Sequence, residues 1–360
     1  MKLRKITAAV LSLSLVCGAV PFSNVYKNDT AVFAEEETEY TEGNYGYLTY
    51  INYGDYIEIS DCDESATSVE IPSDIDGVPV TTIGGYAFAD CENLETIIFP
   101  ESIADIGEGA FYGTRWLIQK RIENPLIIIN NILVDGVDCT GNIVVPEGIT
   151  EIPNDVFFIG PVGGYVGGDA PEGANITSVH IPDSVTKIGY KAFCYCKQLT
   201  EVVVPENVGY LGDSVFLGCE SLRSVVVLNP ECELDFTLYD GLYDLTFYGY
   251  EGSMFQSAVE SACDRWNAYF GEPPVRFAPI SDLYGDIDTD GEVNSSDASS
   301  VLAEYAKTAT GGENSFSQVQ TIAADVNKDG AVDSSDASSI LAYYAYTATG
   351  GEGTLEDFLS

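Results

Sequence analysis

Positive charge is scarce in this sequence. Its 360 residues include 15 Lys and Arg against 57 Asp and Glu, which gives a formal net charge of −42 at pH 7. Nucleic-acid binding depends on Lys and Arg that neutralise phosphates, so this balance excludes a nucleic-acid partner. It favours a soluble protein to which divalent cations bind readily.

Long apolar runs are missing as well. The longest spans residues 6–20, after the basic start MKLRK, and is shorter than the roughly 20 residues that a membrane span requires. This layout is typical of a secretory signal peptide, and Val32-Phe33-Ala34 offers small residues at the −3 and −1 positions of a cleavage site. We therefore expect a signal peptide over residues 1–34, secretion to the extracellular space or the cell surface, and no membrane span.

Histidine occurs once, at His180, and no Cys-x-x-Cys pair exists. The missing pair excludes the common zinc and dithiol sites. A Ser-His or Cys-His mechanism would need His180, which lies inside a predicted strand of a repeat. Two carboxylates could serve a glycosidase, but the repeats and the C-terminal module leave no stretch for a catalytic domain. The sequence therefore predicts no catalytic residue and a protein that is not an enzyme.

Eight cysteines follow the signal peptide, at positions 62, 91, 139, 194, 196, 219, 232 and 263. An even number in a secreted chain suggests disulfides. However, Cys91, Cys196 and Cys219 each follow a repeated Phe by three residues, where a Cys resembles a small buried hydrophobic residue. We favour mostly free thiols, and a bridge between Cys196 and Cys219 stays open.

A repeat fills the middle of the chain. Clear copies span 94–114, 176–196 and 199–219, the last reading LTEVVVPENVGYLGDSVFLGC. Apolar residues recur about every three positions, which neither a helix nor a long strand explains. The repeated Phe recurs after 23 residues, from Phe88 to Phe111 and from Phe193 to Phe216. Such a step predicts a solenoid whose turns each contribute a short strand and a return segment to one core.

Two irregularities interrupt this step. Phe111 and Phe157 are 46 residues apart, so a degenerate turn is expected around 125–136, and the Gly-rich stretch 160–175 is expected to be a loop insertion. A hairpin within 40–62 should cap the first turn. A helix after Ser253 and a strand over 275–280 should cap the last turn, which would otherwise expose its apolar face.

Side chains that point outward along the predicted strands would line an open sheet, the usual binding face of a solenoid. Most of the central ones are aliphatic and would form an apolar patch suited to a partner. The alternative is ordinary β-propensity, or a strip that a loop covers. The candidate ligand face consists of Thr96, Ile98, Val144, His180, Glu201, Val203 and Val226.

A twelve-residue pattern occurs twice near the C-terminus, as DIDTDGEVNSSD from 286 and, 39 residues later, as DVNKDGAVDSSD from 325. Calcium takes six to eight oxygen ligands, and loop positions 1, 3, 5, 9 and 12 carry oxygen side chains in both copies. Position 6 is Gly, which allows a sharp turn, and position 7 offers a backbone carbonyl. An acidic turn that binds nothing is the alternative, and identical duplication argues against it. The predicted ligands of two Ca²⁺ ions are Asp286, Asp288, Asp290, Glu292, Asn294 and Asp297 in the first loop, and Asp325, Asn327, Asp329, Ala331, Asp333 and Asp336 in the second.

A helix is expected after each loop, over 297–312 and 336–351, with a connecting helix within 315–326. No helix leads into the first loop, and position 12 is Asp instead of the Glu of a full EF-hand. The resulting fold class is a mostly β solenoid followed by a small all-α module. The expected segments are a signal peptide (1–34), a hairpin cap (35–65), the solenoid (66–250), a cap helix and strand (251–280), a linker (281–284) and the calcium module (285–360).

The repeats resemble the leucine-rich repeats of bacterial surface antigens. The resemblance rests on the Ile-Gly-x-x-Ala-Phe signature at 83–88, 106–111 and 188–193, and it covers roughly residues 45–280. It implies a leucine-rich repeat solenoid. Ile152-Pro153 departs from the signature, where Gly is usual.

The duplicated loop and helix, with Ser-Ser before the final Asp, resembles the type I dockerin of cellulosomes. That resemblance implies a fold built around calcium and a cohesin module of a scaffoldin as partner. Near-identity of the halves implies that either could face the cohesin, although Glu304 differs from Tyr343 and Lys307 from Tyr346. The residues implied to contact cohesin are Ser295, Ser296, Ser334 and Ser335.

These features together predict a secreted, monomeric, non-catalytic protein. It would dock onto a scaffoldin and display its repeats to a protein or glycan ligand, in the context of plant polysaccharide degradation. The alternative is a carbohydrate-binding or enzymatic component of the same complex. A sugar-binding module would use exposed aromatic platforms, and the chain has only two Trp, Trp116 and Trp266.

Overall fold

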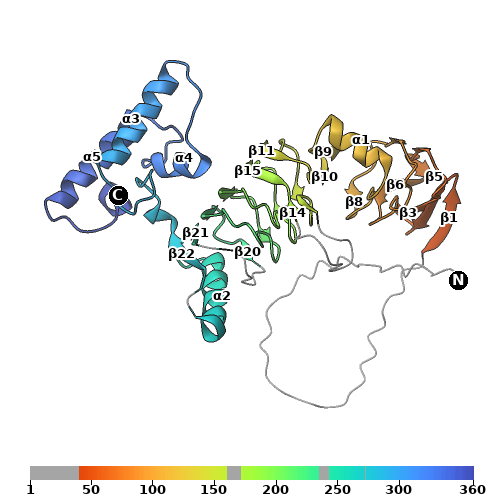
Figure 1. Cartoon of the computed structure of the whole chain (residues 1–360), viewed down its shortest axis with the longest axis horizontal. Helices are drawn as coiled ribbons and strands as arrows, with labels where there is room; N and C mark the ends of the chain where they lie inside the picture. Colours follow the sequence, from red (N-terminus) through yellow and green to blue (C-terminus); the bar gives the residue numbers. More distant parts are fainter. Residues whose placement is uncertain (1–39, 160–171, 235–241, 243, 272) are drawn as a thin grey trace, which may run out of the picture. The chain divides into compact units, whose positions relative to one another are not determined.

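The computed structural model describes residues 40–159, 172–234, 242, 244–271 and 273–360. The predicted signal peptide and most of the Gly-rich insertion lie outside these residues. Tyr40–Ser360 forms one compact unit. Within it a β solenoid precedes a small group of helices, so the predicted fold class is confirmed (Figure 1). Among the described residues, no helix has the length and apolar character to cross a membrane.

An antiparallel meander opens this unit. It consists of β1 (Thr41–Tyr45), β2 (Leu48–Asn52) and β3 (Ile57–Cys62). A hydrogen bond from the Tyr53 amide to the Tyr56 carbonyl (3.0 Å) closes the β2–β3 turn, as the predicted hairpin requires. β3 then pairs in parallel with β6 (Val78–Ile83). The same sheet includes β5 (Asp74–Ile75) and β8 (Asp105–Ile106).

Each later turn contributes a strand to a parallel ladder. The first pair is β4 (Ser68–Glu70) with β7 (Thr96–Ile98). Beyond the interruption, a separate six-stranded sheet has the order β11 (Thr140–Val144), β15 (Asn175–His180), β17 (Glu201–Val204), β19 (Ser224–Val227), β21 (Leu245–Gly249) and β22 (Val275–Pro279). On the return segments a second ladder pairs β12 (Glu151–Ile152), β16 (Lys187–Ile188), β18 (Tyr210–Leu211) and β20 (Glu233–Leu234). A short antiparallel pair, β13 (Phe158–Ile159) and β14 (Glu172–Gly173), flanks the Gly-rich stretch.

The repeated phenylalanines stack between the two ladders. Ring centroids are 5.4 Å apart for Phe88 and Phe111, and 5.2 Å apart for Phe157 and Phe193. Phe193 and Phe216 follow at 6.0 Å. Offset stacking at such distances adds to the stabilisation from burial alone. The predicted 23-residue step therefore sets the spacing of the core.

The residue two positions before each core phenylalanine has a left-handed backbone. Its φ lies between 53° and 61°. In Tyr86, Asp155 and Lys191 the amide also hydrogen-bonds to the next turn, as from Asp155 to the Tyr190 carbonyl (3.0 Å). The residues at this position are Tyr86, Gly109, Asp155, Lys191 and Ser214.

The solenoid is interrupted between Phe111 and Phe157, and the expected degenerate turn is not a strand-and-return unit. A helix, α1 (Arg115–Glu123), and an antiparallel hairpin of β9 (Ile127–Ile129) and β10 (Ile132–Asp135) take its place. Asn130 and Asn131 adopt φ of 49° and 63°, as a two-residue hairpin turn requires. The hydrophobic core divides here into one cluster ending at Ile129 and another beginning at Leu133.

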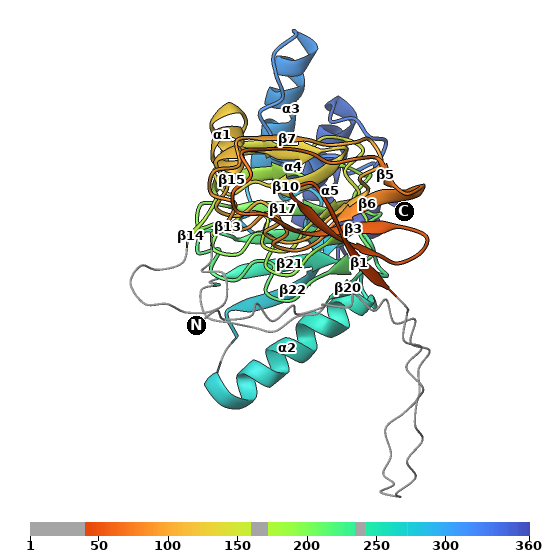
Figure 2. The same cartoon turned by 90° about the vertical axis from the view of Figure 1, so that its right-hand side faces the viewer.

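A helix covers the last turn, as predicted. α2 (Met254–Phe270) begins at Ser253, whose hydroxyl accepts a hydrogen bond from the Gln256 amide (3.0 Å). Figure 2 shows it lying beside β20, β21 and β22. Its buried residues Phe255, Val259 and Ala262 join the core of the solenoid.

The C-terminal helices follow a 3₁₀ turn, η1 (Ile280–Asp282). The predicted helices are all present, each shorter at its C-terminal end than expected. Their bounds are α3 (Ser295–Ala309), α4 (Gln318–Ala324) and α5 (Ser334–Ala348), and an additional α6 (Leu355–Leu359) ends the chain. α3 packs against α5, and α6 against α5.

In the described part of the chain all eight cysteines are thiols outside any disulfide, which is the state favoured from the sequence. Seven are buried, and Cys263 is half-buried. Burial raises the pKa of Cys194 and of Cys196 to about 12. These thiols therefore act as core side chains and not as nucleophiles.

Candidate calcium centre and docking surfaces

The first acidic loop is closed by its own carboxylates. Asp286 accepts hydrogen bonds from the amides of Asp290 (3.1 Å) and Gly291 (2.9 Å), and Asp290 accepts one from the Glu292 amide (2.8 Å). Oxygens of Asp286, Asp288 and Asp290 lie within 4.8 Å of one another. Gly291 has φ of 86°, the conformation for which Gly at position 6 was predicted.

Asp297, at position 12, ties the end of this loop to its beginning. Its side chain is fully buried and accepts hydrogen bonds from the Ile287 amide (2.8 Å) and the Asn294 amide (2.9 Å). The same carboxylate lies in the first turn of α3, where the helix dipole favours negative charge. One residue thus connects the loop to the helix that follows it.

The second loop repeats this arrangement. Asp325 accepts from the amides of Asp329 (3.1 Å) and Gly330 (2.9 Å), and Asp329 accepts from the Ala331 amide (2.9 Å). Asp336 is fully buried and accepts from the Asn327 amide (3.3 Å) and the Asp333 amide (3.0 Å). The duplicated sequence therefore folds into two equivalent loops.

In both loops the residue at position 9 caps the helix that follows, instead of closing the loop. Asn294 and Asp333 cap α3 and α5, because their side-chain oxygens accept hydrogen bonds from the amides of Ser296 (2.7 Å) and Ser335 (2.6 Å). Such a residue reaches a calcium ion through a water molecule in many loops of this kind. Metal ligation by these two side chains stays a prediction.

The electrostatics of the loops suit a hard cation. Burial raises the pKa of the Asp286 carboxyl, and the charge of Asp297 raises it further. Burial likewise raises the pKa of Asp336. A cation held by these oxygens would offset the repulsion and the lost hydration. The donor set therefore fits calcium, which would neutralise the loops and brace the helices that leave them.

The four serines predicted to contact cohesin are exposed, at the first turns of α3 and α5. The Ser296 hydroxyl donates to an oxygen of Asp288 (3.2 Å), and the Ser335 hydroxyl accepts from the Asn327 side chain (2.7 Å). Each loop thereby orients one serine of its pair. Cohesin contact by these serines is a prediction that rests on exposure and position.

Glu304 and its counterpart Tyr343 each hold the segment that follows their helix. Glu304 accepts hydrogen bonds from the amide (2.6 Å) and hydroxyl (2.5 Å) of Ser315, in the connection to α4. Tyr343 donates to the Gly353 carbonyl (2.9 Å), before α6. The difference between Glu304 and Tyr343 lies outside the serine pairs, whereas the difference between Asp288 and Asn327 contacts them.

The candidate ligand face divides into an open part and a covered part. Thr96, Ile98 and Val144 are exposed, with Val144 at 59%. On β17, Glu201 and Val203 are half-buried, and on β19 Val226 is fully buried. The strand registers align Val144, His180, Val203 and Val226 in one row across the sheet.

Helix α4 lies against the covered part. The Ser317 hydroxyl, which caps α4, donates to Glu201 (2.9 Å), and the Gln318 side-chain nitrogen lies 2.6 Å from Nδ1 of His180. Val226 belongs to the same hydrophobic cluster as Ile280 and Val319. On β17 and β19, the aliphatic strip is therefore covered by another segment of the chain. This is the alternative to a binding face, and it applies to this part of the strip.

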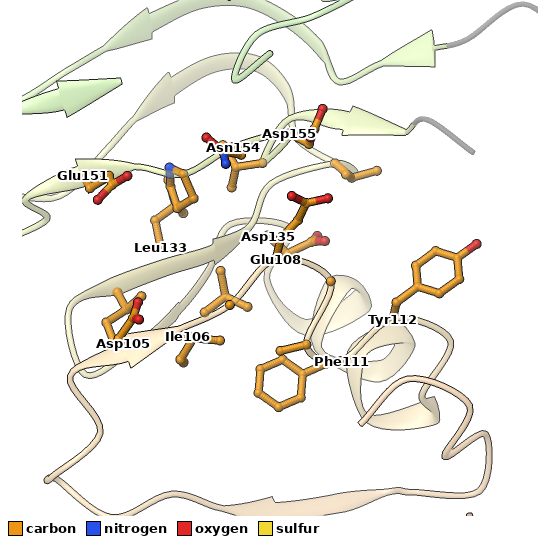
Figure 3. A pocket seen from close by; sticks show the side chains of 18 of the residues that line it. Asp105, Ile106, Glu108, Phe111, Tyr112, Leu133, Asp135, Glu151, Asn154 and Asp155 are labelled. Atoms are coloured by element: carbon orange, nitrogen blue, oxygen red, sulfur yellow. The ribbon is translucent and has the colours of Figure 1, made fainter. Parts of the chain in front are cut away.

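A cavity that the sequence did not indicate lies at the interrupted turn. It has a volume of about 530 Å³ and lies between the turn that ends at Tyr112 and the turn that contains Asp155 (Figure 3). The only sequence signal was the 46-residue spacing from Phe111 to Phe157, which predicts an irregular turn but no cavity.

Two parts of the chain match known families. Residues 60–159 and 165–236 match the BspA type leucine-rich repeat region, in six copies, and residues 284–343 match the dockerin type I domain. No curated protein matches the chain.

Several solved structures are similar to part of the chain. One is a leucine-rich repeat protein of T. pallidum, with 23% identity over 58% of this chain and 82% of that chain, and a TM-score of 0.29. Another is a leucine-rich cell surface protein of Faecalibacterium prausnitzii A2-165, with 19% identity over 52% of this chain and 54% of that chain, and a TM-score of 0.35.

Proposed function

We propose that this chain, which carries leucine-rich repeats of the BspA type and a C-terminal dockerin type I domain, is a non-catalytic docking protein of an extracellular complex. The dockerin would bind a cohesin module of a scaffoldin in a calcium-dependent manner. The repeats would present a protein-binding or glycan-binding surface, in the context of plant polysaccharide degradation. The observation that carries this proposal is the pair of equivalent acidic loops, each of which places two exposed serines at the start of a helix.

Calcium has a structural role in this proposal. The first loop would hold one ion mainly through Asp286, Asp288 and Asp290, and the second would hold another through Asp325 and its equivalents. Each buried Asp at position 12 would transmit loop closure to α3 or α5. Loops that lose the ion would keep like charges close together, which favours their opening.

The experiment is a titration of the full chain with a cohesin module, in calcium and in EDTA. We expect EDTA to abolish binding and to reduce the helical circular dichroism signal, because the metal is coupled to the folding of the loops. The variant Asp286→Ala with Asp325→Ala should bind no cohesin even in calcium, whereas the exposed control Asp183→Ala should bind like the wild type. Binding that EDTA leaves unchanged would contradict the proposal.

The ligand of the repeats would contact the exposed residues Thr96 and Ile98 on β7 and Val144 on β11, which lie in two separate sheets. This surface combines an exposed apolar side chain on β7 with another on β11. Replacing Ile98 and Val144 by Asp should abolish capture of the ligand by the full chain but leave cohesin binding intact. Turnover of a polysaccharide or peptide by the repeats would refute the non-catalytic role.

The predicted signal peptide over residues 1–34 would direct the protein out of the cell. The chain would act as a monomer, with its dockerin as the means of assembly. Detection of the protein on the cell surface or in the medium, cleaved after Ala34, would test this part directly.

A further inference from the structure

The interrupted turn leaves space between two regular turns of the solenoid. One wall is the return segment from Asp105 to Tyr112, and the other is the segment from Glu151 to Phe158. The hairpin of β9 and β10 and the helix α1 fill only part of the gap. All three acidic residues Glu108, Asp135 and Asp155 line the space that remains; Figure 3 shows Glu108 and Asp135 near its centre and Asp155 on the segment above them.

The lining of this cavity has an excess of negative charge. It includes five carboxylates and two cationic side chains, Arg121 and Lys191. Asp135 is neutralised by Arg121, which donates two hydrogen bonds to it (2.9 and 2.6 Å). Glu151 is paired with Lys187 (2.7 Å). The remaining carboxylates are Asp105, Glu108 and Asp155, and within the described residues none of them has a cation within 4.0 Å.

Glu108 and Asp155 line opposite walls of the cavity. Burial and the Glu108 charge raise the pKa of Asp155 to about 6, although Lys191 partly opposes the shift. Glu108 accepts a hydrogen bond from the Tyr86 hydroxyl (3.0 Å). A cation placed near both carboxylates would gain from each of them.

Aromatic rings provide the rest of the recognition surface. Tyr86, Tyr112 and Phe158 line the cavity, and the two tyrosines are 39% and 52% exposed. The site already stabilises one cation in this way, because the Lys191 ammonium lies 5.8 Å from the centre of the Phe158 ring and 4.9 Å from that of Tyr190. Aromatic faces attract organic cations of this kind.

The geometry favours an organic cation over a metal ion. Within the part of the chain that the structure describes, the only three acidic side chains whose oxygens converge to metal-binding distances are Asp286, Asp288 and Asp290. The cavity carboxylates are farther apart than such a group, and its volume of about 530 Å³ is that of a small-molecule site. We propose that this cavity binds an organic cation of the size of a lysine side chain, with its ammonium group near Glu108 and Asp155 and its methylene chain against the aromatic lining.

The test uses N-acetyl-lysine amide as probe and the full chain in saturating calcium, so that the acidic loops are occupied. Isothermal titration should show binding that weakens about tenfold when Glu108→Gln and Asp155→Asn are combined. The uncharged probe N-acetyl-norleucine amide should bind about tenfold more weakly than the lysine probe. The exposed control Glu206→Gln should bind the lysine probe like the wild type, which separates the cavity from the general acidity of the surface.

Three results would overturn the proposal: no binding to the wild type, equal binding by the double variant, or an equal loss in Glu206→Gln. Circular dichroism melting of each variant distinguishes a lost site from a lost fold. The cavity lies in the repeats, so this result is independent of cohesin binding.

Discussion

Each regular turn needs one residue that accepts a left-handed backbone, and the residue chosen there affects the surface chemistry. Gly109 meets the need without strain, whereas Asp155 and Lys191 accept φ of 53° and 54°. Asp tolerates this region better than most residues. Asp155 also lines the cavity, so a residue placed by backbone geometry carries a half-buried charge there.

The charge of Asp155 predicts how the stability of the variant Asp155→Asn depends on pH. The pKa of Asp155 is raised from 3.8 to about 6 in the folded protein. As pH rises from 4 to 6, the Asp155 carboxyl therefore loses its proton in the unfolded chain before it does so in the folded protein. Over this pH window the wild type loses stability relative to the Asp155→Asn variant. At pH 7.5 we expect the variant to be more stable by about 1–2 kcal/mol, after allowance for solvent screening. Asn also tolerates the left-handed backbone, so the exchange adds no strain there.

Urea unfolding at pH 4 and pH 7.5 measures this difference. The gap between wild type and variant should be larger at the higher pH, and the exposed control Asp183→Asn should show no such change. A gap that is independent of pH would mean that the Asp155 carboxyl is not destabilised by its surroundings.

At the level of elements, the regular turns were predictable and the interruption was not. The stacked phenylalanines follow directly from the 23-residue step. Helix α1 was missed because Thr114 occupies the repeat position that Cys91 and Cys196 occupy in other turns, so the pattern reads it as one more core residue. In the structure Thr114 is fully buried but caps the helix, since its hydroxyl accepts from the Leu117 amide (3.1 Å). Thr114 fits both the core position of a repeat and the cap of a helix. The packing of Trp116 on Phe111 favours the helix.

Thr114→Val should therefore destabilise the protein. It keeps the shape but removes the cap and the hydrogen bond to the Phe111 carbonyl (2.8 Å), so we expect a loss of about 1–2 kcal/mol in the free energy of unfolding. Thr114→Ser retains the hydroxyl and should lose less. Urea denaturation of both variants is the measurement, and a loss in Thr114→Ser larger than that in Thr114→Val would assign the effect to the methyl group instead of the cap.

Across the whole described unit, the calcium loops were predictable because each is a local pattern of twelve residues. The covered part of the sheet was not, because Ser317 meets Glu201 across 116 residues of chain. No periodicity links such partners. The predicted linker, residues 281–284, is short, and the structure adds the surfaces that meet on either side of it.

Val226→Asp tests this contact. It introduces a charge at a fully buried position between β19 and the C-terminal helices, which should cost several kcal/mol, on the order of 2–4. Calorimetry in calcium should show one unfolding transition for the wild type and two for the variant, because the helices would no longer be stabilised by the sheet. The matched control is Val144→Asp, in the same row of the sheet but exposed. A single transition at the wild-type temperature in Val226→Asp would show that the contact contributes no stability.

The strand β22 has a mechanical consequence. It pairs in parallel with β21 over five residues and leads through η1 directly into the acidic loops. When cohesin holds the C-terminal helices and a surface holds the repeats, tension crosses the molecule through this strand. A pull along its axis loads all five pairs in shear at once, whereas a pull across it would open them one after another. The protein should therefore resist force best when the two anchors lie in line with β22, a property that single-molecule stretching can measure.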